Sequence, residues 1–142
     1  MRILGLDFGD KTIGVAVSDP FLMIAQALEV IERKNENEFK APMRRLAEII
    51  EEYEISKIVL GMPKNMNNTE GERCVKTLDF KERLNKRFPL LPVILQDERL
   101  STVAAEKSLI SAGMRREERK KVIDKMAAHY ILQGYLDQRS EG

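Results

Sequence analysis

The chain has 142 residues, of which 43% are hydrophobic and 33% charged, the composition of an ordinary globular protein. This length suits a single domain spanning residues 1–142. The formal net charge is only +1, so a polyanionic partner would require Lys and Arg to be concentrated on one face. Cys74 is the only cysteine, which excludes an internal disulfide and a CxxC zinc site. The N-terminus enters a predicted strand at once and no apolar run could span a bilayer, so we expect a cytoplasmic protein that does not bind membranes.

The first predicted element is a buried strand over Ile3–Gly9, which places one carboxylate, Asp7, immediately before a glycine turn. A second apolar run, Ile13–Val17, completes a β-hairpin. An ionised carboxylate on an apolar strand is costly unless a metal ion, a cationic side chain or a reacting group compensates it. Asp7 is therefore a candidate functional residue. The alternative is a turn-forming aspartate that accepts hydrogen bonds from the following backbone amides.

The remaining predicted elements alternate between strands and helices. A third strand is followed by an amphipathic helix, a strand buried on both faces, a second helix, a last buried strand and two closing helices. Their predicted ranges are 25–31, 39–53, 58–61, 71–87, 93–95, 101–113 and 116–137. This order predicts an α/β fold with a mixed five-stranded sheet, in which a three-strand antiparallel meander is joined by two parallel strands and flanked by helices.

Acidic side chains end both the first and the last predicted strand. Asp7 closes the first strand, and Asp97 and Glu98 close the last. Ligands bind beyond the carboxyl ends of the central strands of such sheets, so these carboxylates are candidates for one site. Successive strand residues point to opposite faces, so only one of Asp97 and Glu98 can share the surroundings of Asp7. The spacing alone does not choose between them.

A third carboxylate comes from the closing helix. Its predicted apolar stripe consists of Ile123, Ala127, Tyr130, Ile131 and Gly134. Asp124 falls at the edge of this stripe, where neighbouring alanines leave a small-residue gap around its charge. The alternative is an ordinary surface aspartate at the stripe margin. His129, the only histidine, falls on the polar side with Gln133, where a solvated side chain is expected.

Three converging carboxylates would repel one another and raise their own pKa values unless a cation bridged them. Hard oxygen ligands with room for water suit Mg²⁺ or Mn²⁺ rather than zinc. Two such ions about 4 Å apart can activate a water molecule and stabilise the leaving oxygen in phosphodiester cleavage. The carboxylates therefore favour a metal-dependent hydrolytic site.

Cationic side chains crowd the start of the closing helix. The run consists of Arg115, Arg116, Arg119, Lys120, Lys121 and Lys125, diluted by Glu117 and Glu118. Either a solvated helix start or a patch that contacts phosphate groups would explain it. The sequence leaves both interpretations open.

Four motifs run through the chain in order. They are Leu6–Asp19, Val59–Pro63 with Thr69–Gly71, Asp97–Thr102, and Asp124–Ala128. Through these motifs, and above all the string Asp-Glu-Arg-Leu-Ser-Thr, the chain resembles the YqgF/RuvX family of pre-16S rRNA nucleases, which is related to RuvC-type Holliday junction resolvases. The resemblance spans essentially the whole chain. Thr12 departs from the family pattern, in which arginine usually follows the lysine.

The resemblance implies an RNase H-like fold in a single nuclease domain over residues 1–142. It implies that the catalytic, metal-binding triad is Asp7, Glu98 and Asp124, with two Mg²⁺ or Mn²⁺ ions as cofactors, and thus favours Glu98 over its neighbour. The implied nucleic-acid contacts are Lys11, Arg99, Ser101 and Thr102, since arginine grips phosphate bidentately and hydroxyls at a helix start add to its anion-binding amides. The alternative role for Arg99 is a structural ion pair with Asp97 or Asp124.

Three functions compete at this stage. The first is a metal-dependent nuclease that matures the 5′ end of precursor 16S rRNA, with ribosomal particles as partners, or that resolves branched DNA; it would recognise RNA by shape and backbone. The second is a nucleic-acid-binding factor that no longer cuts. The third is a nucleotide-binding domain of the actin and sugar-kinase type, whose phosphate loop also has Asp-x-Gly after a strand. That third fold needs two domains, and 142 residues supply one.

Overall fold

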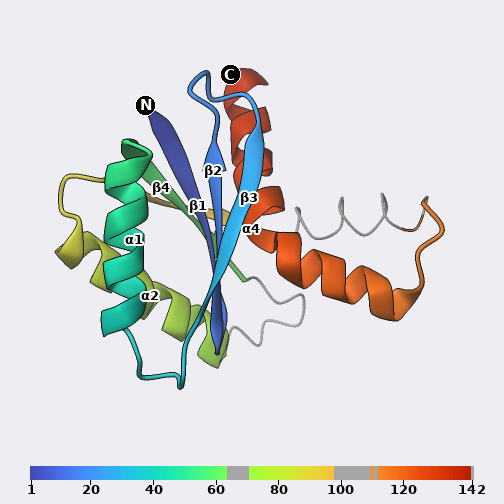
Figure 1. Cartoon of the computed structure of the whole chain (residues 1–142), viewed down its shortest axis with the longest axis horizontal. Coiled ribbons are helices and arrows are strands. Elements are labelled where there is room, and N and C mark those ends of the chain that lie inside the picture. Colours follow the sequence, from blue (N-terminus) through green and yellow to red (C-terminus); the bar gives the residue numbers. More distant parts are fainter. Residues whose placement is uncertain (64–70, 98–109, 111, 142) are drawn as a thin grey trace.

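The computed structural model describes residues 1–63, 71–97, 110 and 112–141, without the side chains of residues 72, 119–125, 140 and 141. Strands and helices follow the predicted order (Figure 1). The strands are β1 (Arg2–Phe8), β2 (Thr12–Ser18), β3 (Ala25–Glu32), β4 (Ile55–Met62) and β5 (Val93–Asp97). The helices are α1 (Lys40–Glu52), α2 (Glu72–Arg87) and α4 (Arg116–Glu141). The helix predicted over 101–113 lies outside the described residues except at its end, where Gly113 has the left-handed φ of 78° that suits a helix stop.

The sheet confirms the predicted mixed topology. Its strand order is β3-β2-β1-β4-β5. The first three strands pair antiparallel as a meander, and β4 and β5 add parallel to β1. Because β1, β3, β4 and β5 run in one direction, their carboxyl ends all lie at the edge of the sheet where Asp7 sits.

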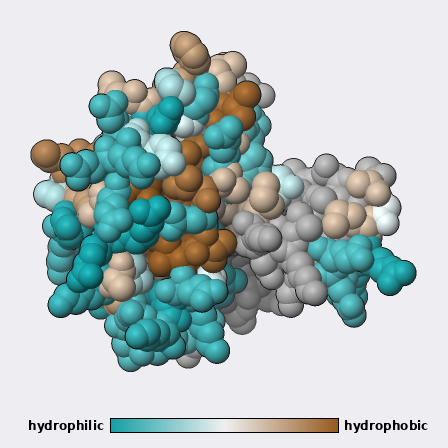
Figure 2. All heavy atoms as spheres, viewed as in Figure 1, coloured by the Kyte–Doolittle hydropathy of each residue, from teal (hydrophilic) through white to brown (hydrophobic). Residues whose placement is uncertain are grey.

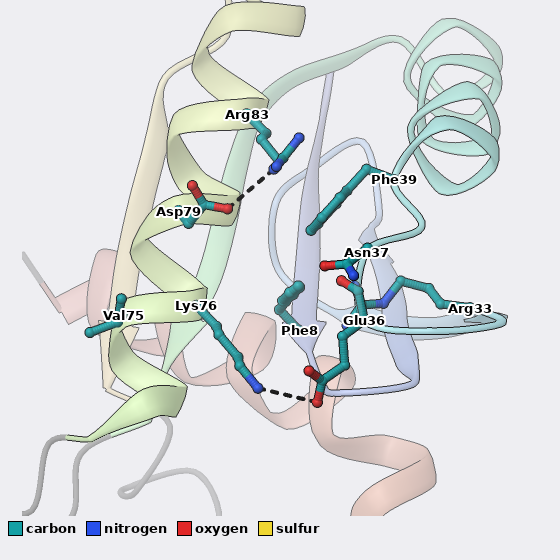
Figure 3. A pocket seen from close by; sticks show the side chains of 9 residues that line it. All are labelled: Phe8, Arg33, Glu36, Asn37, Phe39, Val75, Lys76, Asp79 and Arg83. Carbon is teal, nitrogen blue, oxygen red and sulfur yellow. Dashed lines mark hydrogen bonds and ion pairs between the residues drawn. The ribbon is translucent and has the colours of Figure 1, made fainter.

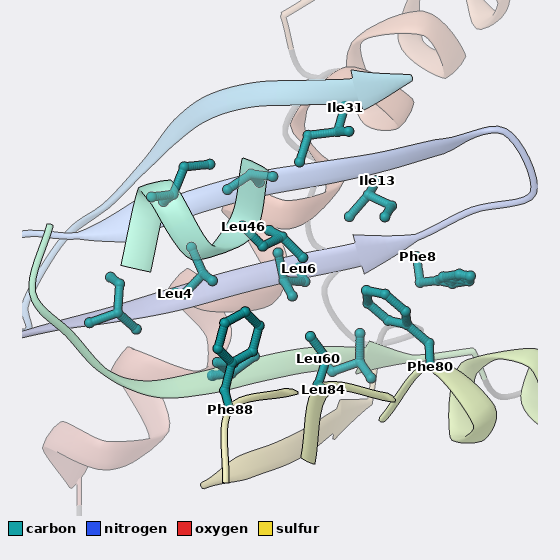
Figure 4. Close-up of a cluster of buried hydrophobic side chains, with 14 of the residues drawn as sticks. Leu4, Leu6, Phe8, Ile13, Ile31, Leu46, Leu60, Phe80, Leu84 and Phe88 are labelled. Atoms are coloured by element: carbon teal, nitrogen blue, oxygen red, sulfur yellow. The ribbon is translucent and has the colours of Figure 1, made fainter. Parts of the chain in front are cut away.

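Helices cover the two faces of the sheet differently. Figure 1 shows α1 and α2 on one side of the sheet and α4 on the other. The larger core fills the α1–α2 side, where Leu4, Leu6 and Phe8 of β1 meet Leu46 of α1 and Phe80 of α2 (Figure 4). Figure 2 shows hydrophilic side chains over much of the outer surface of α1, with hydrophobic ones gathered between α1 and β3. Among the described residues, no helix is both long enough and apolar enough to cross a membrane.

On the opposite face, α4 lies unusually close to the sheet because glycines stand beneath it. A Cβ placed on Gly5 would lie 2.7 Å from Cβ of Leu132 and 3.2 Å from the carbonyl oxygen of Ala128. A Cβ on Gly61 would collide with the Cδ1 atom of Ile131. These glycines remove the side-chain layer that normally separates a helix from a sheet, so the backbone of α4 approaches the strands directly.

The buried face of α4 differs from the predicted stripe. Its fully buried side chains are Ala128, Ile131, Leu132 and Leu136. The stripe was therefore predicted one residue out of phase, because the glycines beneath the helix, and not hydropathy alone, decide which face packs. Gln133, expected on a polar face, accepts a hydrogen bond from the backbone N–H of Ala25 (2.8 Å) and donates one to the carbonyl oxygen of Met23 (3.0 Å). His129 is half-buried, and its Nδ1 atom is shielded from solvent.

The close approach of α4 predicts unequal effects of adding a methyl group at the two glycines. Gly5→Ala should lower the free energy of unfolding by about 1–3 kcal/mol, because its Cβ meets a Cβ and a backbone oxygen that cannot move separately from the helix. Gly61→Ala should cost less, because the Cδ1 end of Ile131 can rotate away. Urea denaturation followed by circular dichroism measures both.

Gly14→Ala is the matched control, because its Cβ would make only ordinary contacts at 3.5 Å. A Gly61→Ala variant less stable than Gly5→Ala would contradict this account of how α4 docks.

Candidate active site

Asp7 faces the α4 side of the sheet. It lies two residues after Gly5, so both point to the same face of β1. Its antiparallel partner is Gly14, and a Cβ placed there would lie 3.5 Å from Cβ of Asp7 and 3.5 Å from Cβ of Ala128. Asp7 is partly buried, and its Oδ1 atom is shielded from solvent. The predicted functional carboxylate therefore lies under the helix and not on an outer turn.

The direction of α4 brings its residue 124 towards Asp7. Leu132 of the helix lies over Gly5, and Ala128 lies over the Asp7–Gly14 pair. Advancing along β1 thus corresponds to moving back along α4. Residue 124 is one turn, about 6 Å, before Ala128 on the same helix face. The helix thus runs back towards the carboxyl end of β1 as far as Ala128, and residue 124 lies one turn beyond, where α4 begins to leave the sheet (Figure 1).

The register of the last strand distinguishes the two acidic residues that follow it. Leu6 pairs with Leu60, so the next residue, Asp7, is level with Gly61, which in turn pairs with Gln96. The side chain of Gln96 points to the α4 face, since its Nε2 donates to Oε1 of Gln138 (3.3 Å). Because successive strand residues alternate, Asp97 points to the opposite face from Asp7. This excludes Asp97 from the surroundings of Asp7 and leaves Glu98 as the candidate.

Several predicted site residues lie outside the part of the chain that the structure describes. They are Glu98, Arg99, Ser101 and Thr102, together with the side chain of Asp124. Among the side chains that are described, no three acidic, histidine or cysteine groups come together as a metal site. Of the predicted triad, the structure thus fixes the side chain of Asp7 and the backbone position of residue 124. Lys11 is exposed in the turn after β1.

An arginine that the sequence did not single out holds this turn. Arg33 is only 5% exposed, and its guanidinium donates hydrogen bonds to the carbonyl oxygens of Gly9, Asp10 (2.7 Å) and Glu36 (3.0 Å). The same guanidinium lies over the ring of Phe8, 4.4 Å from its centroid. Arg33 therefore joins the β1–β2 turn to the segment that follows β3. In sequence it is one charge in a charged connector, and no spacing marks it as buried.

Charges around Arg33 form a linked group. Burial lowers the pKa of Arg33, while the carboxylates of Asp10, Glu36 and Glu38 act to raise it. Nζ of Lys76, on α2, lies 3.2 Å from Oε1 of Glu36 (Figure 3). The same nitrogen lies 3.7 Å from Oδ1 of Asp10. These contacts connect α2 to the turn that follows Asp7. They are partly exposed, so each contributes modestly to stability.

The cationic run at the start of α4 is exposed where it is described. Arg115 and Arg116 are solvent-accessible, as are Glu117 and Glu118 in the first turn. Figure 1 shows the N-terminal part of α4 turning away from the sheet, whereas its C-terminal part lies along it. Both predicted roles, solvated helix start and phosphate-contacting patch, fit this position.

The fold is shared with a solved structure. Thermus thermophilus RuvC, solved in complex with a Holliday junction substrate, matches with a TM-score of 0.61 at 17% identity, covering 99% of this chain and 96% of RuvC. A second structure of the same RuvC gives a TM-score of 0.58. The molecule thus has the RuvC-like form of the RNase H fold, as the resemblance implied.

Sequence comparisons define the family. A family model described as "RuvX: Holliday junction resolvase" matches residues 1–138. A protein of Agathobacter rectalis named as a pre-16S rRNA nuclease is 56% identical over 140 residues, covering 99% of this chain and 97% of its own. A protein of the same name from Desulforamulus reducens is 58% identical over 137 residues, covering 96% of this chain and 97% of its own. The chain belongs to the RuvX family.

The hydrogen bonds of Arg33 predict a large stability effect of its removal. Arg33→Ala should lower the free energy of unfolding by about 2 kcal/mol or more, because three carbonyl oxygens lose a charged donor and Phe8 loses its cover. Arg33→Lys should recover only part of the loss, since an ammonium group cannot span the same acceptors. Thermal and urea unfolding measure both.

The adjacent Lys34 is exposed and supplies the control, with an expected change within about 0.5 kcal/mol for Lys34→Ala. Equal stabilities of Arg33→Ala and Lys34→Ala would show that the turn does not depend on this arginine.

Proposed function

We propose that this protein is a metal-dependent nuclease that hydrolyses phosphodiester bonds, and that its substrate is precursor 16S rRNA, cut at the 5′ end. The observation that carries the proposal is the antiparallel docking of α4 over β1, which brings residue 124 towards the Asp7 end of the strand. A RuvX family model matches residues 1–138, which supports the same activity. The alternative of an isolated turn-forming aspartate fits less well, because Asp7 lies beneath a helix on the sheet face.

The proposed ligands of the metal are the carboxylates of Asp7, Glu98 and Asp124. The chemistry at Asp7 fits a hard cation, since the group is an oxygen donor and its neighbours Gly14 and Ala128 occupy little space. Two Mg²⁺ or Mn²⁺ ions bound there would supply the activation of water and the stabilisation of the leaving oxygen. The protein's own part is to hold Asp7 and Asp124 on β1 and α4, two elements whose separation is fixed by close backbone contact, with Glu98 following β5.

The proposed contacts to the substrate backbone are Lys11, Arg99, Ser101 and Thr102. Lys11 is exposed in the turn directly after β1, four residues beyond Asp7, which suits a phosphate next to the cleaved bond. Arg33 fixes the carbonyl groups of the two residues before Lys11 and so restricts that turn. Arg33 acts on the substrate only through the turn and is a positioning residue.

The choice of precursor rRNA over branched DNA rests on the relatives. The pre-16S rRNA nucleases named above match over nearly their whole length at more than 50% identity. Branched DNA is the second candidate, because the family description is Holliday junction resolvase and the RuvC structure holds that substrate. A ribosomal RNA precursor as substrate would place the protein in the cytoplasm, acting on ribosomal particles. Parallel cleavage assays on precursor 16S rRNA and on a four-way DNA junction distinguish the two.

The first functional prediction concerns Asp7. Asp7→Asn should reduce the cleavage rate about 100-fold or more. The amide keeps the shape of the carboxylate but is uncharged, so it binds a metal ion much more weakly. Asp10→Asn is the matched control: it changes a carboxylate in the same turn that is exposed and contacts Lys76 at 3.7 Å. Gel-based cleavage of precursor 16S rRNA is the readout. Asp7→Asn cleaving as fast as Asp10→Asn would refute the proposed site.

The second functional prediction concerns the metal. Chelation by EDTA should abolish cleavage, and added Mg²⁺ or Mn²⁺ should restore it, because the proposed ligands are hard oxygen donors. Titration calorimetry should show Mn²⁺ binding to the wild type and weaker binding to Asp7→Asn. Cleavage that persists in EDTA, in a preparation shown to be free of other nucleases, would exclude the metal-dependent mechanism.

A further inference from the structure

A second cationic feature lies away from Asp7, on the face of the sheet that α1 and α2 cover. A hollow of about 450 Å³ between these helices is lined by Phe39, Lys40, Met43, Arg44, Arg83 and Arg87. We call it the α1–α2 groove. Four of the six side chains are cationic, and the described residues that line it include no carboxylate. Against a net charge of +1 for the whole chain, this is a strong local excess of positive charge.

The four cations of the groove are exposed, and two of them lie over aromatic rings. Lys40 and Arg44 are exposed and lie one turn apart on α1. The guanidinium of Arg83 lies 3.8 Å from the centroid of Phe39, and that of Arg87 lies 5.1 Å from the centroid of Phe88. Rings orient a guanidinium without neutralising its charge, so its N–H groups stay available to an anion. Among the described residues, the groove cation that forms an ion pair is Arg83, whose Nε lies 3.2 Å from Oδ2 of Asp79.

The groove is continuous with the region of the candidate active site. It shares Phe39 and Arg83 with a second hollow of about 310 Å³, which extends to Phe8 (Figure 3). This second hollow is of mixed charge, because Arg33 and Lys76 line it together with Glu36 and Asp79. Phe8 is the residue after Asp7, and Arg33 holds the turn that follows. A strand bound at Asp7 could therefore continue around the edge of the sheet into the α1–α2 groove.

The length of α2 indicates how long this route for a bound nucleic-acid strand would be. Lys76, Arg83 and Arg87 follow one another along one face of α2, and eleven residues separate the first from the last, about 16 Å of helix. Both α1 and α2 begin at the carboxyl end of the sheet, because each follows a strand that runs in the direction of β1. The route therefore leads from the carboxyl end of the sheet, through the hollow of mixed charge, to the cationic α1–α2 groove between the two helices.

We propose that the α1–α2 groove binds the phosphodiester backbone of the nucleic-acid substrate, at a segment flanking the bond that is cut. The proposal rests on the nuclease function proposed above and extends it with a second contact surface. Lys40, Arg44, Arg83 and Arg87 supply the phosphate contacts, which fix the position of the strand without reading its sequence. This surface provides the local concentration of cations that a nearly neutral nucleic-acid-binding protein requires.

The test measures RNA binding under conditions that prevent cleavage. The probe is a fluorescein-labelled single-stranded RNA from the 5′ region of precursor 16S rRNA, in Ca²⁺ buffer, followed by polarisation at increasing salt. The test variant is Lys40→Gln with Arg44→Gln. The matched control is Lys86→Gln with Arg139→Gln, which removes two exposed cations that do not line the groove. All substituted side chains are exposed, and melting curves verify that both proteins fold.

The groove variant should bind about 10-fold more weakly at low salt. Its plot of log affinity against log salt should be shallower by about 1.4, since each contact to a single strand contributes about 0.7. The control should match the wild type. If both variants lose affinity equally, or neither does, the groove is not a binding surface. Asp7→Asn should bind the probe with wild-type salt dependence.

The two proposals fail in different ways. If the wild type cleaves precursor 16S rRNA and the groove variant binds like the control, the groove proposal is overturned and the nuclease proposal stands. If the wild type binds the probe with a salt slope that the groove variant lowers, yet never cleaves with Mg²⁺ or Mn²⁺, the groove is upheld and the nuclease function fails. If the wild type does not bind nucleic acid, both are wrong.

Discussion

The structure depends on the direct contact between α4 and the centre of the sheet. Where Gly5, Gly14 and Gly61 lie on adjacent strands, no side chain keeps the helix away, and α4 rests on backbone and on the small side chain of Ala128. A helix held off by a layer of leucines would stand several ångströms further from β1. The carboxylates proposed as metal ligands on the strand and the helix would then be too far apart to share one ion. The glycines are therefore as much a part of the candidate site as Asp7.

The strand β1 serves two purposes through the alternation of its side chains. Leu4, Leu6 and Phe8 point into the larger core, where the ring of Phe8 stacks on Phe80 with centroids 4.3 Å apart. Gly5 and Asp7 point the other way, to α4. One face thus contributes most of the buried apolar area, which stabilises the fold. The other face can tolerate glycines and a charge because that stability is already provided.

Local patterns in the sequence correctly predicted those features of the fold that depend on local interactions. The order of elements, the mixed sheet and the position of Asp7 at the end of the first strand all follow from runs of apolar residues and their boundaries. The stripe of α4 was misplaced because helical periodicity does not show which residues face glycines on strands more than 60 residues earlier. The same limit concealed Arg33, two of whose three acceptors lie 23 and 24 residues away, and the α1–α2 groove, whose cations come from two helices distant in sequence. The register of the strands, and not the spacing of residues in the sequence, excluded Asp97 from the surroundings of Asp7.

The position of α4 in the chain has a consequence for biosynthesis. The sheet and the α1–α2 face are encoded before residue 98, whereas the helix that approaches Asp7 is translated after them. The strands and the α1–α2 groove therefore leave the ribosome first, and helix α4 leaves it last. If Asp124 is a metal ligand as proposed above, the growing polypeptide lacks that ligand until α4 has been translated. The candidate active site would be complete only when α4 has left the exit tunnel and packed against the glycines of the sheet.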